Sequence, residues 1–136
     1  MIEKEKDLIP LISIVDDDES VREATLGFLI NMGYRAKAFS SAAEFLGWPL
    51  LNETKCLILD LRMPGMNGLQ LQSRLAADGR RIPIIFISAH DNQECQAEAM
   101  RGGAKAYLIK PYGEKAMLSA IANALQISPE NKGQES

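Results

Sequence analysis

The chain has 136 residues, of which 46% are hydrophobic, and this length supports one domain with a sizeable core. Its formal net charge of −3 excludes a general electrostatic attraction to nucleic acid or to an anionic membrane. No apolar run approaches the length of a membrane span, and the charged start MIEKEKD is unlike a secretory signal.

The two ends of the chain differ in composition from its middle. Residues 1–8 begin with a charged run and are predicted to be frayed, whereas residues 128–136 (SPENKGQES) have no apolar side chain and are typical of a polar tail or linker stub. We therefore expect one domain over residues 9–127. The two cysteines, Cys56 and Cys95, lack metal-ligand spacing and fit a reducing compartment, so we expect a cytoplasmic protein.

Apolar runs of strand length alternate with segments of helical periodicity along the whole domain. In chain order, strands and helices are predicted over residues 8–15, 19–32, 34–39, 41–47, 56–59, 67–79, 84–87, 91–101, 104–109 and 114–127. Five strands that alternate with five helices predict an α/β fold, in which a parallel sheet is covered on both faces through right-handed crossovers.

The helical segments have recognisable ends and faces. Ser41 and Glu44 are spaced as a capping box, and Asn67 is a candidate cap of the third helix. The first helix is predicted to bury a stripe made of Val21, Ala24, Thr25, Phe28 and Met32. The last helix is predicted to bury Met117, Leu118, Ile121, Ala122 and Leu125. The fourth helix has few large apolar residues, so we expect it to make few buried contacts.

Polar side chains gather where the strands end. The first strand runs into Asp16-Asp17-Asp18, the third into Asp60, the fourth into Ser88 and the fifth into Lys110. In a doubly wound sheet of order 2-1-3-4-5, the first, third and fourth strands are neighbours, and ligands bind beyond their carboxyl ends. Crowded carboxylates cannot all stay ionised without help, and Mg²⁺, which prefers oxygen ligands, would resolve their repulsion.

Each of these features alone has an ordinary explanation. An aspartate run before a helix commonly caps that helix, and a serine at a strand end does the same. A lysine before a proline, as in Lys110-Pro111, commonly faces solvent. Their joint occurrence at the ends of four strands of one short domain favours a functional site instead.

The motifs IVDDD (14–18), LDLRMPGMNG (59–68), FISAH (86–90) and AYLIKP (106–111) occur in an order and spacing that resemble the receiver domains of response regulators, the CheY-like family. The residues of the second motif further resemble those in the receivers of FixJ/LuxR-type regulators, which precede DNA-binding domains. The resemblance implies a flavodoxin-like, doubly wound (βα)5 fold in three layers, with parallel sheet order 2-1-3-4-5.

The resemblance also implies a role for each matching residue. Asp60 would be the phosphoacceptor. Asp16 and Asp17, together with Asp60 and the backbone carbonyl of Arg62, would hold Mg²⁺. Lys110 would bind the phosphoryl group, with a cis bond to Pro111. Ser88 would be the switch hydroxyl and Tyr107 the aromatic switch. Asp18 leaves the register of the acidic run open, and we assign the metal to the two aspartates nearer the strand.

A receiver of this kind would promote its own phosphorylation and dephosphorylation without being a turnover enzyme. Its phosphodonor would be a sensor histidine kinase, a phosphotransfer protein or a small acyl phosphate, because an ionised carboxylate needs no general base. We expect the face formed by residues 91–101, 104–109 and 114–127 to switch and to bind an output partner or a second copy. We expect no direct binding to nucleic acid or membrane.

Two other functions fit these residues less well. A haloacid-dehalogenase-type phosphatase has a D-x-D motif after a strand, as in residues 16–18, but Glu19-Ser20 follows here, and Asp60 would have no role. A flavodoxin-like FMN protein needs a phosphate-binding loop after the first strand, where three aspartates would repel the phosphate. The lone histidine, His90, is interpreted as a loop residue and not as a phosphorelay histidine.

Overall fold

The computed structural model describes residues 9–126, and its sheet has the predicted order, β2-β1-β3-β4-β5, with all neighbouring strands parallel. The strands are β1 (Leu11–Val15), β2 (Arg35–Phe39), β3 (Thr54–Asp60), β4 (Ile84–Ser88) and β5 (Ala106–Ile109). The helices are α2 (Glu19–Asn31), α3 (Ala42–Leu46), α4 (Gly68–Ala77), α5 (Gln93–Arg101) and α6 (Glu114–Leu125), with a 3-10 turn, η1 (Leu51–Glu53), before β3. The α/β, flavodoxin-like prediction is confirmed.

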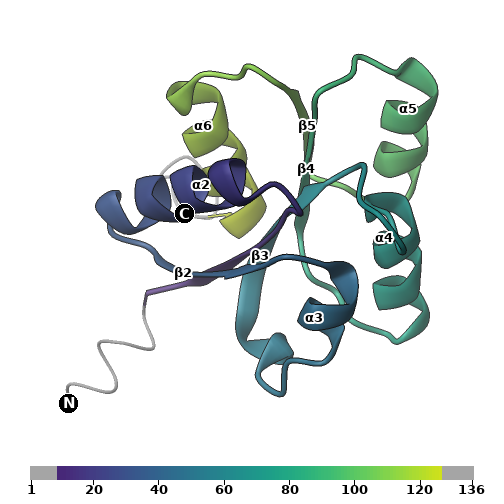
Figure 1. Cartoon of the computed structure of the whole chain (residues 1–136), viewed down its shortest axis with the longest axis horizontal. Coiled ribbons are helices and arrows are strands. Elements are labelled where there is room, and N and C mark those ends of the chain that lie inside the picture. Colours follow the sequence, from purple (N-terminus) through teal and green to yellow (C-terminus); the bar gives the residue numbers. More distant parts are fainter. Residues whose placement is uncertain (1–8, 127–136) are drawn as a thin grey trace, which may run out of the picture.

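Two apolar cores lie on opposite faces of the sheet, which gives the fold its three layers. Helices α2 and α6 cover one face, and α3, α4 and α5 cover the other (Figure 1). Alternate residues of β3 enter alternate cores: Ile58 packs under α2 and α6, whereas Leu57 and Leu59 pack under the other three helices. Both faces of β3 are therefore buried, as its uninterrupted apolar run predicts.

Side-chain caps fix where the helices begin. The Ser41 hydroxyl accepts a hydrogen bond from the backbone N–H of Glu44 (3.0 Å). The Glu44 carboxylate accepts in turn from the backbone N–H of Ser40 (2.6 Å), whereas a capping box predicts the N–H of Ser41. Asn67 caps α4 in a reciprocal capping box with Gln70. These caps account for the predicted helix starts, because they satisfy N–H groups that have no partner inside the helix.

The predicted faces of two helices need correction. In α2, Ala24 is exposed, as is Met32 at the C-cap, and the buried residues are Thr25 and Leu29. In α6, the buried residues are Met117, Ala120, Ile121 and Ala124, whereas Leu118, Ala122 and Leu125 are half-buried. The helices share one face of the sheet (Figure 1), and Leu29, Met117 and Ile121 pack in the same core beneath them.

Strand boundaries also differ in detail from the expected ones. Strand β1 begins only at Leu11, directly after Pro10, which lacks the N–H that a ladder needs. Strand β3 extends from Thr54 to Asp60, so Asp60 is a strand residue. Strand β5 begins at Ala106, two residues later than predicted. The predictions for residues 1–8 and 128–136 lie outside the described residues. Within the described part of the chain, no helix is long and apolar enough to cross a membrane.

Candidate functional site

Strand register brings the predicted site residues to one edge of the sheet. Val15 of β1 pairs with Leu59 of β3, so Asp16 and Asp60, the next residues, lie side by side. Asp60 in turn pairs with Ile87 of β4, one residue before Ser88. The backbone N–H of Lys110 donates to the Ser88 carbonyl (2.8 Å), which ties the end of β5 to the same edge.

Three carboxylates form a cluster at this edge. Asp16, Asp17 and Asp60 each offer an oxygen within 4.8 Å of the others, and Asp16 and Asp60 are buried whereas Asp17 is exposed. Burial, followed by the charge of the neighbouring Asp16, raises the pKa of Asp60 to about 7. Burial also raises the pKa of Asp16. The hydrogen bond from the N–H of Asp18 and the charge of Lys110 lower this pKa, but burial has the larger effect. The cluster therefore favours a bound proton or a bound cation.

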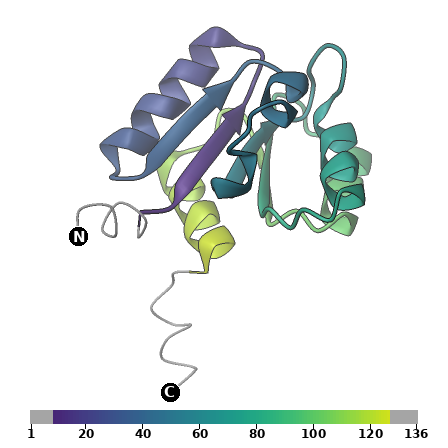
Figure 2. The ribbon, with the colours of Figure 1, turned by 90° about the horizontal axis from the view of Figure 1, so that it is seen from below.

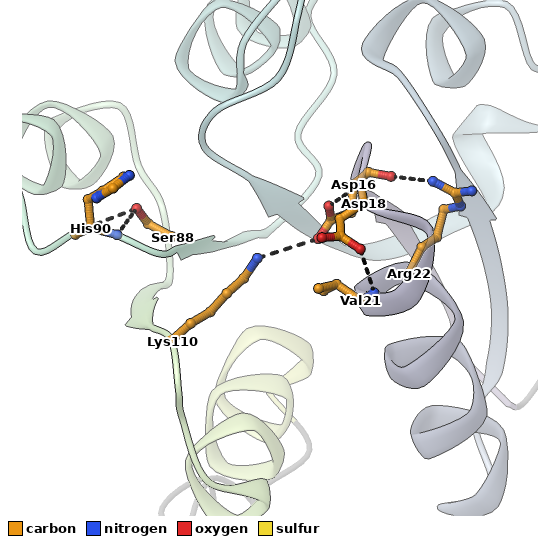
Figure 3. A network of polar contacts seen from close by, with 7 residues as sticks. All are labelled: Asp16, Asp18, Val21, Arg22, Ser88, His90 and Lys110. Atoms are coloured by element: carbon orange, nitrogen blue, oxygen red, sulfur yellow. Dashed lines mark hydrogen bonds and ion pairs between the residues drawn. The ribbon is translucent and has the colours of Figure 1, made fainter.

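The two oxygens of the Asp16 carboxylate have different surroundings. Oδ1 accepts from the backbone N–H of Asp18 (2.9 Å), while Oδ2 lies 3.8 Å from the Lys110 ammonium (Figure 3). Oδ2 is buried and has no hydrogen-bond partner among the described residues. A buried carboxylate oxygen without a donor, beside two further carboxylates, matches the all-oxygen ligand set that a hard cation such as Mg²⁺ prefers.

The third aspartate of the acidic run has a different task from the first two. Asp18 is the N-cap of α2, and its carboxylate accepts from the backbone N–H of Val21 (3.2 Å; Figure 3). The helix-capping interpretation of the run is therefore correct for Asp18, while Asp16 and Asp17 join the cluster. This division of roles supports the assignment of the metal to Asp16 and Asp17, the two aspartates nearer the strand.

Arg22 is a site neighbour that the sequence reasoning missed. Its guanidinium Nη1, on the first turns of α2, donates to the backbone carbonyl of Asp16 (2.8 Å; Figure 3). This contact holds the turn between β1 and α2 from the helix side. The available signal was spacing: Arg22 comes four residues after the cap Asp18, so it lies one helical turn further on and can reach back.

The Ser88 hydroxyl is bound within its own loop. The backbone N–H of His90 donates to Ser88 Oγ (3.1 Å), and the hydroxyl donates to the His90 carbonyl (3.1 Å; Figure 3). His90 is an exposed loop residue, as predicted. The half-buried Tyr107 lies 6.3 Å from Phe86 between ring centroids, and its buried hydroxyl has no hydrogen-bond partner among the described residues.

The loop after Asp60 passes very close to the site. A Cβ added to Gly68 would lie 2.6 Å from the backbone oxygen of Asp60, so the first turn of α4 packs directly against the end of β3. Arg62 lies in this loop with an exposed side chain, and the ligand role of its carbonyl stays a prediction. The Lys110-Pro111 peptide bond is cis, as the family resemblance implied.

Comparison with known proteins agrees with this geometry. The profile of the response regulator receiver domain matches residues 12–122. The chain is 44% identical over 122 residues to the response regulator protein TmoT of Ectopseudomonas mendocina, covering 90% of this chain and 56% of that protein. It is 34% identical over 124 residues to the transcriptional regulatory protein FixJ of Azorhizobium caulinodans, covering 91% of this chain and 59% of FixJ.

Solved structures give the same result. The crystal structure titled FixJ-N has a TM-score of 0.80 at 34% identity and covers 86% of this chain and 94% of that chain. The response regulator StyR has a TM-score of 0.79 at 40% identity, covering 93% of this chain and 64% of StyR. The chain therefore spans little more than half the length of the curated relatives that it matches.

Proposed function

The chain belongs to the response regulator receiver family, and on that basis we propose that its Asp60 carboxylate accepts one phosphoryl group with the help of Mg²⁺. Domains of this family are signalling modules of two-component systems, not turnover enzymes. The observation that carries the proposal is the convergence of Asp16, Asp17 and Asp60 within 4.8 Å, next to the Lys110 ammonium.

In the proposed step, a carboxylate oxygen of Asp60 attacks the phosphorus of the donor. A new O–P bond forms, the bond from phosphorus to the donor breaks, and the donor leaves with that electron pair, so that Asp60 becomes a mixed anhydride. Once Asp60 has lost its proton, the attacking carboxylate is an anion, so the step needs no general base. The work of the site is then positioning and charge stabilisation.

The other residues have distinct roles in this account. Asp16, Asp17 and the carbonyl of Arg62 would hold the metal beside Asp60. Bound Mg²⁺ would supply positive charge to the phosphoryl oxygens. The Lys110 ammonium lies 3.8 Å from the Asp16 carboxylate, and it would form an ion pair with the oxygens of the new phosphoryl group. Arg22 would keep Asp16 in place through the backbone carbonyl that it binds.

The test is intact-mass measurement after incubation with a small acyl phosphate and Mg²⁺. We expect one added phosphoryl group in the wild type and none in Asp60→Asn or in excess EDTA. Asp91→Asn, an exposed loop substitution, is the matched control and should be phosphorylated normally. Addition that survives Asp60→Asn would refute the assignment.

We further propose that the signal leaves through the face formed by α5, β5 and α6. Ser88 would have to exchange its contacts with His90 for the phosphoryl group, which would draw the loop after β4 inward. Helix α5 follows that loop, and Ala99 is its one fully buried residue, so its displacement costs little. This face would contact an output partner or a second phosphorylated copy. The phosphodonor for Asp60 would be a histidine kinase or a phosphotransfer protein.

Amide hydrogen exchange with and without a phosphoryl mimic tests this route. We expect the largest changes in α5 and the loop before it, and a loss of those changes in Ser88→Ala. Largest changes in α2, or an intact response in Ser88→Ala, would contradict the proposed route.

A further inference from the structure

Helix α5 is held very differently at its two ends. Ala99, near its C-terminal end, is fully buried, and Ala104, in the turn that follows, is buried in the same apolar core. At the N-terminal end, Gln93 and Glu94 are exposed and Cys95 is half-buried. The fully buried part of α5 is therefore its C-terminal end.

Backbone hydrogen bonds strengthen the hold on the C-terminal end. The N–H of Ala104 donates to the carbonyl of Ala99 (3.1 Å), and the left-handed Gly103 between them (φ +100°) closes the helix as in a Schellman motif. One residue later, the N–H of Lys105 donates to the carbonyl of Ile84 (2.8 Å), which ties the turn to the start of β4.

A side chain of the neighbouring helix binds the same end. Helix α4 lies beside α5 (Figure 1 and Figure 2), and the buried Gln72 of α4 donates from Nε2 to the Ala99 carbonyl (2.9 Å). A carbonyl oxygen has two lone pairs, so it can accept from Gln72 and from the N–H of Ala104 together. Gly102 leaves room for this contact, because a Cβ there would lie 2.7 Å from Cδ and Oε1 of Gln72.

The N-terminal end of α5 is held only locally. Its cap, Asn92, accepts from the N–H of Cys95 (3.0 Å), and this bond would move together with the helix. The Ser88 hydroxyl before it bonds within its own loop. Among residues 9–126, no ion pair joins α5 to another element. Opening of this end therefore breaks few contacts.

We propose that α5 pivots about its C-terminal end, and that the contact of Gln72 with Ala99 and Gly102 is the fixed point. Gln72 is then a positioning residue for α5. If the signal leaves through α5, a consequence that rests on the function proposed above, this pivot turns a movement of the loop after β4 into a rotation of the helix. The anchoring itself needs no phosphorylation.

Amide hydrogen exchange of the unphosphorylated full chain, resolved by NMR for each residue, tests this anchoring. After correction for intrinsic rates, the amides of Gly103 and Ala104 should exchange about tenfold more slowly than those of Ala97 and Glu98. No phosphodonor is added, so the result does not depend on the proposed function of Asp60.

Substitutions at the pivot identify the contact responsible. Gln72→Met keeps the side-chain volume but removes the donor, and it should speed exchange at Gly103 and Ala104 about fivefold, the effect of losing one hydrogen bond. Gly102→Ala should do the same by displacing the carboxamide, since the right-handed backbone of Gly102 (φ −78°) itself tolerates alanine. Ser73→Met, an exposed change on the same helix, should have no effect.

A double-mutant cycle shows whether the two positions act through one contact. Gln72→Ala removes the group with which a Cβ at Gly102 would clash, so adding Gly102→Ala to it should cause no further acceleration at Ala104. Accelerations that multiply in the double variant would mean that the two residues act separately, and would contradict the proposal.

Three further results would overturn it. Equal protection along α5 in the parent chain would mean that neither end is the fixed one. Unchanged exchange at Ala104 in both Gln72→Met and Gly102→Ala would mean that the carboxamide anchors nothing. Acceleration of the slowest amides of β3 by the same factor as Ala104 would mean that Gln72 stabilises the whole fold and not the end of α5.

Discussion

Asp16 and Asp60 lie side by side at the ends of β1 and β3, buried, with carboxylate oxygens within 4.8 Å of each other. Removal from water, followed by the charge of Asp16, raises the pKa of Asp60 to about 7. Without a metal, the pair therefore holds a proton close to neutral pH. A divalent cation would have to displace that proton.

The first prediction concerns the pH dependence of Mg²⁺ binding. Because the proton competes with the metal below a pKa of about 7, the affinity should rise from about pH 6 to about pH 8 and then level off. Isothermal titration in buffers of different ionisation enthalpy measures the proton released at neutral pH. An affinity that does not change with pH, without proton release, would contradict the shared proton.

The second prediction concerns stability in metal-free buffer. The folded-state pKa of Asp60 lies above its ordinary value of 3.8, so the folded state keeps a proton that the unfolded state loses. The free energy of unfolding should therefore fall as pH rises from about 4 to about 7. At about pH 8, Asp60→Asn should raise it by about 2 kcal/mol in chemical denaturation, whereas Asp91→Asn should leave it unchanged. A destabilised Asp60→Asn would refute the argument.

The third prediction compares two glycines. A Cβ on Gly68 would lie 2.6 Å from the Asp60 backbone oxygen and 3.1 Å from the Leu61 Cα, and neither can move freely. Gly68→Ala should cost about 2 kcal/mol and lower the Mg²⁺ affinity. Gly27→Ala, in α2 with nothing within 4 Å of the added Cβ, should instead stabilise the protein by up to about 1 kcal/mol. Equal effects of the two changes would show that the close approach is relieved.

The fourth prediction concerns the hydroxyl of Tyr107, which is buried without a hydrogen-bond partner among the described residues. An unsatisfied buried hydroxyl is unfavourable, so Tyr107→Phe should raise the free energy of unfolding by about 1 kcal/mol while leaving phosphorylation intact. Thermal and chemical denaturation measure this change. A loss of stability would instead mean that the hydroxyl has a partner, such as an ordered water.

The gathering of these side chains at one edge of the sheet was predictable, because strand-end positions follow directly from the parallel topology. Asp16, Asp17, Asp60 and Lys110 come together once the strand order is known, and that order follows from the family resemblance. The capping residues Ser41 and Asn67 were also predictable, since a cap acts on its own helix within a few residues.

Contacts between elements were harder to predict. The buried side of α2 is centred on Leu29, because its rotation is set by how it crosses the sheet beside α6. The buried amide of Gln72 in α4 donates to the carbonyl of Ala99 in α5 (2.9 Å), and no local pattern indicates that pair. The tight approach of Gly68 to Asp60 likewise depends on how the loop folds back onto β3.

The most direct test of the central claim identifies the modified atom. An acyl phosphate is reduced by borohydride to an alcohol, which converts the phosphorylated aspartate to homoserine without affecting free carboxylates. After incubation with a small acyl phosphate and Mg²⁺, reduction, proteolysis and peptide sequencing by mass spectrometry should find homoserine at position 60 alone. Homoserine at position 16 or 17, or a phosphate that resists reduction on Ser88, would contradict the assignment of Asp60.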